Sequence, residues 1–144
     1  MTMSITYDFQ NGIPTVNHHN LGSNFLAVSK QQELSAYSTH TIINIYMNQT
    51  RLGWVKWIKN SQSTHGYWCG YLLVPQSDSK IFNLLDNDEE SARLGLPIFS
   101  YSSKDNGSNI IGWDNNRGQS EHYNLHDTCK MLWRTWFHMM MIDN

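Results

Sequence analysis

Charged residues and cysteines are both scarce in this sequence. Only 15% of its 144 residues are charged, and 10 basic side chains stand against 12 acidic ones. This balance indicates no patch for DNA or an anionic membrane, and it argues against direct nucleic-acid binding. Cys69 and Cys129 lie far apart and outside any CxxC pair, which is typical of free thiols in a reducing cytosol. No apolar run comes near the roughly 18 residues of a membrane span, so we expect a cytoplasmic protein without a membrane partner.

Catalytic signatures are missing as well. The sequence has no glycine-rich loop for a phosphate and no His-Glu-x-x-His zinc motif. His122 and His126 are four residues apart, so on one helix their rings would share a face and form a candidate metal site. The His-Asp-Thr triplet at 126–128 is one of the two His-x-Thr triplets that two-histidine phosphoesterases need, and no second one is present. We therefore expect no cofactor and no enzymatic activity. A metal-dependent hydrolase or phosphoesterase using these two histidines is the alternative.

Aromatic residues are plentiful, with six Trp, seven Tyr and five Phe. The longest run of aromatic and aliphatic residues, 66–74, predicts a buried strand that ends at Pro75, because proline cannot donate to a sheet. Gly70 inside this run predicts a bulge, or a point where a ligand or another backbone comes close. Most of the rings are expected in the core, since each buries a large area.

Four further strands are predicted around this central one. They lie at about 41–47, 53–58, 97–102 and 109–114. The polar stretch 60–63 is short enough to join two antiparallel strands, and Asn106-Gly107 marks the turn of a second hairpin. Residues 1–38 have little regular pattern and are expected to be irregular, apart from a short helix through 26–37.

A C-terminal helix at about 122–141 is the clearest element. Its apolar residues form one broad stripe at helical spacing: Leu125, Cys129, Leu132, Trp133, Trp136, Phe137 and Met140. Asn124 is a suitable N-cap, and Asp127 would lie in the first turn, where the helix dipole favours an acid. Burial of the stripe on the sheet gives an α+β fold with a mostly antiparallel sheet of about four to five strands. We expect a single domain over 1–144, with its sheet core at 41–118.

A candidate binding site combines aromatic rings with a polar turn. The rings are those of Trp68, Tyr71, Tyr101 and Trp113, on strands predicted to be neighbours, and the polar residues are Asp114, Asn116 and Arg117 after the last strand. Aromatic faces accept a flat ring, while arginine and amides bind phosphates or base edges. The sequence therefore predicts a site for a nucleotide-like molecule or a partner protein. The alternative is that the rings belong to the core and the polar run is an ordinary turn.

Three segments carry a resemblance to a known group of proteins. They are Gly-Tyr-Trp-Cys-Gly-Tyr-Leu-Leu-Val-Pro at 66–75, Leu-Pro-Ile-Phe-Ser-Tyr-Ser at 96–102 and Ile-Gly-Trp-Asp at 111–114. These segments resemble a widespread group of small phage and prophage proteins with a Gly-Tyr-Val-x-Val-Pro strand, a Gly-Gly-Leu-Thr-Tyr segment and a Gly-Phe-Asp segment. The group also has a His-Gly-Gly segment and a His-x-Gly-Asp segment. In this sequence Leu-Gly-Leu-Pro at 94–97 stands in place of the first, and Asn-Arg-Gly-Gln at 116–119 stands in place of the second. If those histidines serve a reaction in the group, this chain lacks it.

The resemblance implies a phage context more than a chemistry. A small phage protein without catalytic signatures is expected to be an antagonist of host defence, acting in the host cytoplasm. It would inhibit an effector protein such as a nuclease, or sequester a nucleotide signal. A virion structural or assembly protein, which would form a homo-oligomer, stays open as a further alternative.

Overall fold

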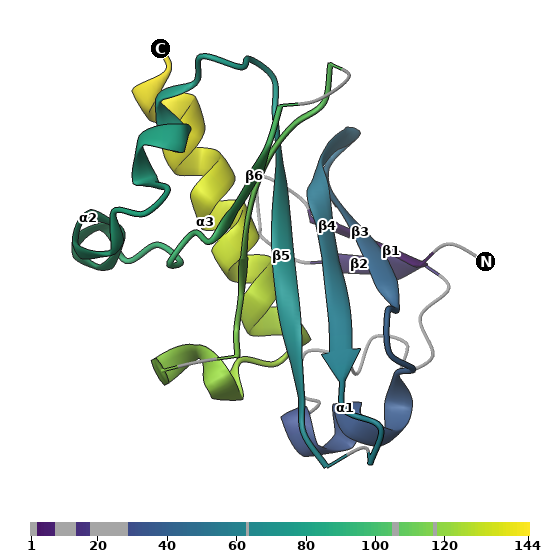
Figure 1. Ribbon diagram of the computed structural model, residues 1–144. Helices are drawn as coiled ribbons and strands as arrows, with labels where there is room; N and C mark the ends of the chain where they lie inside the picture. The colour runs from purple at the N-terminus through teal and green to yellow at the C-terminus, as the bar shows by residue number, and fades with distance from the viewer. Residues whose placement is uncertain (1–2, 8–13, 18–28, 63, 105–106, 117) are drawn as a thin grey trace.

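The computed structural model describes residues 3–7, 14–17, 29–62, 64–104, 107–116 and 118–144 (Figure 1). In this part of the chain seven strands form one sheet, in the order β2-β1-β3-β4-β5-β7-β6. The strands are β1 (Met3–Tyr7), β2 (Pro14–Asn17), β3 (Ile42–Met47), β4 (Thr50–Lys59), β5 (Gly66–Val74), β6 (Tyr101–Ser103) and β7 (Asn109–Asp114). Neighbouring strands run antiparallel except β1 and β3, which are parallel.

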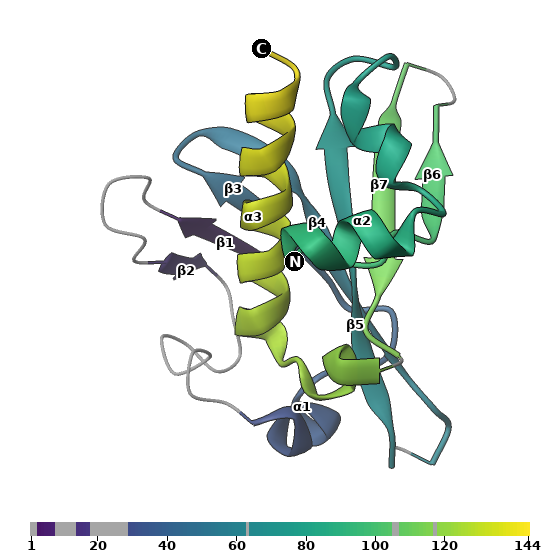
Figure 2. The same ribbon diagram turned by 90° about the vertical axis from the view of Figure 1, so that its left-hand side faces the viewer.

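Two of the helices lie on the same face of this sheet. The helices are α1 (Lys30–Ala36), α2 (Asp88–Leu94) and α3 (Leu125–Ile142), with the short 3-10 helices η2 (Lys80–Leu84) and η3 (Gly118–His122). Figure 2 shows α2 and α3 in front of the sheet, and Figure 1 shows α1 at the end of strands β4 and β5. The hydrophobic core lies between the sheet and α3. The predicted α+β fold, with a C-terminal helix on a mostly antiparallel sheet, is confirmed.

The N-terminal region contains two strands that the sequence does not predict. β1 pairs with β3, and β2 pairs with β1, so the sheet exceeds the predicted four to five strands. Helix α1 begins at Lys30 after the N-cap Ser29, while residues 26–28 of the predicted helix lie outside the described residues. The prediction of an irregular region at 1–38 is therefore wrong at Met3–Tyr7 and Pro14–Asn17, whereas α1 lies within the short helix predicted at 26–37. Strands this short gain stability only from the sheet that they join, and a local pattern does not reveal that partner.

The strand predicted at 97–102 is shorter than expected. β6 spans Tyr101–Ser103; the N–H of Ser100 still donates to the carbonyl oxygen of Gly112 over 3.0 Å, and the residues before it leave the sheet for the core. Pro97 has no N–H group to donate. Phe99 is 1% exposed and meets the ring of Trp113 edge to face, with centroids 6.1 Å apart.

Gly70 is required by a neighbouring side chain and not by a bulge. On the α3 side of β5, the indole of Trp113 lies directly over Gly70, and a Cβ at this position would be 2.3 Å from Cη2 of that ring. The prediction of a bulge here is wrong. The irregular pairing lies between β3 and β4, at Ile45 and Tyr46, where Gly53 opposite has a φ of +157°.

Helix α3 begins at Leu125, later than the predicted 122, because Asn124 caps it. The Asn124 side chain accepts from the N–H of Asp127, and the Asp127 carboxylate accepts from the N–H of Asn124. This reciprocal capping box satisfies two N–H groups that have no partner inside the helix. No helix in the described part of the chain combines the length and the apolar character needed to cross a membrane.

The sheet covers only part of the apolar stripe of α3. The buried side chains are those of Leu125, Thr128, Cys129, Leu132, Thr135 and Met139, and Trp136 packs half-buried against them. Trp133 is 36% exposed, and Phe137 and Met140 are each 41% exposed, so the prediction that these three lie against the sheet is wrong. A helix touches a sheet along a limited arc, and this stripe is wider than that arc.

Candidate functional site

The four aromatic rings of the predicted site lie on opposite faces of the sheet. Trp68 and Trp113 point toward α3 and are 0% and 3% exposed. Tyr71 and Tyr101 point to the other face, here called the outer face, where Tyr101 is 47% exposed and Tyr71 is half-buried. Side chains alternate along a strand, so positions 68 and 71, an odd number apart, must face opposite ways. The rings therefore do not form one site, in contrast to the prediction.

Both inner tryptophans donate hydrogen bonds to buried polar side chains. The indole N–H of Trp68 donates to Oε1 of Glu33 over 3.1 Å. The indole N–H of Trp113 donates to Oδ1 of Asn115 over 3.0 Å. Asn115 is 0% exposed and donates from Nδ2 to Oγ1 of Thr128 on α3 over 2.9 Å. These rings join the sheet to the helices. Sequence reasoning misses Glu33 and Asn115, because a polar residue on a short helix or after a strand has the pattern of a surface residue.

Glu33 connects three elements through one buried carboxylate. The residue lies on α1 and is 0% exposed. Besides the bond from Trp68 on β5, its Oε2 accepts from the backbone N–H of Leu125 over 2.8 Å. Leu125 is the first residue of α3, where N–H groups lack helical partners and the dipole favours negative charge. Burial nevertheless raises the pKa of Glu33 to about 7, against the opposing effect of these two bonds.

A cleft lies beside the end of β7. Its volume is about 580 Å³, and it is bordered by α2, the segment 95–98, the end of β7 and α3. The polar lining includes Asp88, Asp114, Tyr123 and Arg134. The size falls within the range of small-molecule sites, and the lining offers both signs of charge.

The predicted polar turn is only partly at this cleft. Asp114 and Trp113 are among the residues that line it. Asn116 is exposed, and its Oδ1 lies 2.8 Å from Nε2 of His65. Arg117 lies outside the described residues. Of the predicted site residues, the structure therefore brings Trp113 and Asp114 together in the cleft and Tyr71 and Tyr101 together on the outer face.

A row of side chains crosses the outer face, perpendicular to the strands. Its members are paired in register from β3 to β6: Asn44, Trp54, Tyr71, Gly112 and Tyr101. The rings of Trp54 and Tyr71 stack with centroids 5.2 Å apart and planes at 18°. The ring of Tyr101 meets Tyr71 edge to face at 5.8 Å. Among the described helices, none covers this face of β4 and β5 (Figure 1).

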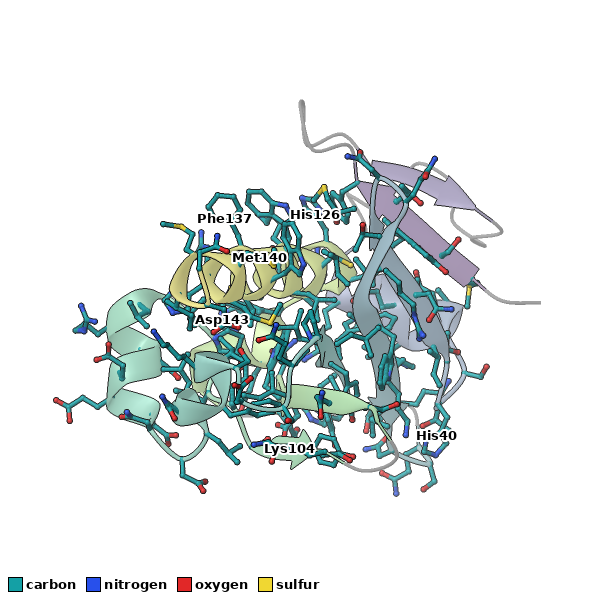
Figure 3. The ribbon with its side chains drawn as sticks, turned by 90° about the horizontal axis from the view of Figure 1, so that it is seen from above. His40, Lys104, His126, Phe137, Met140 and Asp143 are labelled. Atoms are coloured by element: carbon teal, nitrogen blue, oxygen red, sulfur yellow. The ribbon has the colours of Figure 1, made fainter. Side chains whose placement is uncertain are left out.

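A second exposed surface lies on α3 and is apolar. It consists of Trp133, Phe137, Met140 and Met141, with exposed fractions from 36% to 65%, and is here called the α3 ridge. The rings of Trp133 and Phe137 are in contact, with centroids 5.8 Å apart. Figure 3 shows Phe137 projecting from the side of α3 that faces away from α2.

The two histidines of the metal alternative belong to different elements. His122 ends η3 and is exposed, whereas His126 lies in the first turn of α3. They do not share a helical face, because η3 ends before α3 begins. Among the described residues, no group of three or more His, Cys, Asp or Glu side chains is placed to hold a metal ion. Burial raises the pKa of Cys69 to about 11 and that of Cys129 to about 12, so both thiols stay protonated and unreactive at neutral pH.

Comparison with known proteins leaves the family open. No protein-family model, curated protein or solved structure matches this chain. The class that the fold defines is an α+β protein with one helix packed across a mostly antiparallel sheet. The resemblance to small phage proteins remains a sequence-based expectation, so function has to be inferred from the cleft, the outer face and the α3 ridge.

Proposed function

We propose that this protein is a small non-enzymatic binding protein that covers a surface of another protein with its α3 ridge. One observation carries the proposal. Among the described residues, four of the six exposed large hydrophobic side chains lie on this single helix. Large apolar side chains exposed singly are normal, but a contiguous group of them marks an interaction surface. The core does not require these four side chains, because the opposite side of α3 supplies its contacts with the sheet.

The charges beside the α3 ridge indicate which partner fits it. Lys130 is exposed and lies three residues before Trp133, so helical geometry places it beside that ring. Arg134, also exposed, lies at the border with the cleft, where its guanidinium donates to the carbonyl oxygen of Gly95. Neither forms an ion pair within the described chain, where Arg93 and Glu90 make the only one. The nearby Asp127 is engaged in the capping box. We therefore expect a partner with an apolar centre bordered by carboxylates.

Such a surface suits an inhibitor that occludes its target. In the phage context that the resemblance implies, the target is a host defence protein, such as a nuclease effector, in the host cytoplasm. Occlusion requires no catalytic group and no cofactor; it requires only that the covered surface be the one that the target uses.

A second candidate function, sequestering a nucleotide-like molecule, is supported by the cleft beside β7. Its volume of about 580 Å³ is sufficient for such a ligand. Arg134 can bind a phosphate, and Tyr123 offers an aromatic ring. Asp88 lines the same cleft, however, and its carboxylate repels an anion. This repulsion favours the protein partner as the main function.

Selection from a peptide library displayed on filamentous phage tests the proposal before any partner is known. With the purified protein immobilised, we expect enrichment of peptides that combine apolar residues with Asp or Glu. A selected peptide should bind Phe137→Ser at least about tenfold more weakly, as for loss of a central ring in an interface. Ile42→Ser is the matched control and should bind like the parent, because Ile42 is 46% exposed but lies on the outer face.

Other outcomes would point elsewhere. Peptides that bind Phe137→Ser as well as the parent would refute the role of the ridge. A dimer in light scattering that becomes monomeric in Phe137→Ser would identify a second copy as the occupant and favour the assembly protein. Binding to anionic vesicles without peptide enrichment would identify a membrane surface. Thermal stabilisation by nucleotides that is lost in Tyr123→Ala would support the cleft.

A further inference from the structure

The outer face presents aromatic rings in a way that needs a glycine. Tyr71 leans over β7, where its cross-strand neighbour is Gly112. A Cβ at Gly112 would lie 2.7 Å from Cδ1 of Tyr71, so any other residue would displace the ring. Trp54 stacks on one side of Tyr71, and Tyr101, which is 47% exposed, meets it on the other. The row is thus a set of three touching rings that together cross four strands.

Cations stand beside these rings on the same strand and face. The guanidinium of Arg51 lies 5.3 Å from the ring centroid of Trp54, and its Nη2 donates to Oδ1 of Asn44 over 2.7 Å. These contacts hold the cation in place without neutralising it, because neither partner is a carboxylate. Lys56 lies two residues beyond Trp54 on β4 and so points to the same face. The acid on this face is Asp114, which pairs with Cys69 and whose charge, in addition to burial, helps to raise the pKa of Tyr71; it lies two strands away from Lys56.

We propose that the outer face binds single-stranded nucleic acid. Unpaired bases stack on the exposed ring of Tyr101 and on the Trp54–Tyr71 pair, while Arg51 and Lys56 contact phosphates. Aromatic rings beside basic side chains are the combination by which sheets bind single strands with little sequence preference. The net charge of −2 argues against nucleic-acid binding only as an average over the chain. It does not show that two cations and three rings share one face.

The cations decide between this ligand and other polymers. A neutral polysaccharide can stack on the rings but gains nothing from Arg51 and Lys56. A duplex keeps its base faces paired and stacked, so it cannot use the rings. An anionic polymer with free flat rings uses both parts of the surface.

Fluorescence anisotropy with labelled oligo(dT) and oligo(rU) tests the proposal. Oligonucleotides of about ten nucleotides are suitable, because this length lies within the usual site sizes for single strands. We expect saturable binding that weakens as salt rises from about 50 to 200 mM. The affinity of Tyr101→Leu for the oligonucleotides should fall by a factor of about five or more, as expected when one stacked base loses its ring. Tyr101→Phe keeps the ring and should bind like the parent. Arg51→Gln should weaken binding and lower its dependence on salt, because one phosphate contact is lost.

The control for charge is Lys80→Gln, which removes one positive charge from η2 on the α3 side. It should bind the oligonucleotides like the parent. Absence of saturable binding at low salt would overturn the proposal, as would equal weakening by Arg51→Gln and Lys80→Gln. Equal affinity of Tyr101→Leu and the parent would remove the stacking role. Binding of a neutral β-glucan in place of the oligonucleotides would overturn the choice of ligand. Because the α3 ridge lies on the other side of the sheet, these outcomes are independent of the protein partner.

Discussion

Replacing Glu33 by glutamine is expected to destabilise the protein by removing one of two buried acceptors. The carboxyl group accepts from the indole N–H of Trp68 and the backbone N–H of Leu125, over 3.1 and 2.8 Å. Both oxygens keep lone pairs for these bonds when the group is protonated. A glutamine amide has one acceptor oxygen, so the second donor would face an NH2 group. Leaving a buried donor unsatisfied costs about 1–3 kcal/mol, and the free energy of unfolding at about pH 4.5 should fall by that amount.

The same residue makes stability depend on pH. The pKa of Glu33 is about 7 in the folded protein, against an ordinary value of 4.5, because burial disfavours the charged form. Between these two values the native state holds a proton that the unfolded chain releases. The stability contributed by this proton is fully present below pH 4.5 and is lost as the pH rises through 7. The complete loss corresponds to about 3 kcal/mol at most.

Urea melts of the parent and Glu33→Gln at about pH 4.5, 6 and 7.5 isolate this effect, because the variant keeps every other titrating group. One of those groups acts in the opposite sense: burial lowers the pKa of His126, so its protonation destabilises the fold as the pH falls. The gap in unfolding free energy between parent and variant should narrow as the pH rises. Glu89→Gln, at an exposed position of α2, should leave almost no gap at any pH. A Glu33→Gln gap that is constant or widens toward pH 7.5 would refute the reasoning.

Two further predictions concern packing. Met139 is 1% exposed, so Met139→Ala should lower the free energy of unfolding by about 2–5 kcal/mol. Its neighbour Met140 is 41% exposed, and Met140→Ala should lower it by about 1 kcal/mol or less. Equal losses in urea melts would contradict the assignment of the two faces of α3. Gly70→Ala places a methyl group 2.3 Å from the indole ring of Trp113 and should lower the free energy of unfolding by about 1–3 kcal/mol. Displacement of that ring should also change the near-ultraviolet circular dichroism spectrum. A variant as stable as the parent would show that the ring does not lie over this glycine.

Local signals in the sequence were sufficient for the elements that depend on neighbours along the chain. The hairpin of β4 and β5 follows from two apolar runs joined by a short polar turn, and the start of α3 follows from the capping residues Asn124 and Asp127. β1 was missed although its residues alternate, because a strand of five residues is stable only beside β3, which lies far away in the sequence.

The site depends on facts that are not local. The sequence shows that Trp113 and Asp114 follow one another, and the structure keeps both at the cleft. Strand alternation already requires Trp68 and Tyr71 to face opposite ways, because they are an odd number of residues apart. Only the position of α3 decides which of the two faces is buried.

What the sequence alone determined is therefore the identity of most elements: each strand or helix forms from spacing, caps and turns within a few residues. Which side of an element is covered was decided only by the tertiary structure, because burial belongs to two surfaces in contact. The apolar stripe of α3 is wider than the sheet can cover, so Leu132 enters the core while Phe137 stays exposed. Glu33 has the local pattern of a solvated helix residue, and the approach of β5 and α3 makes it a buried acceptor.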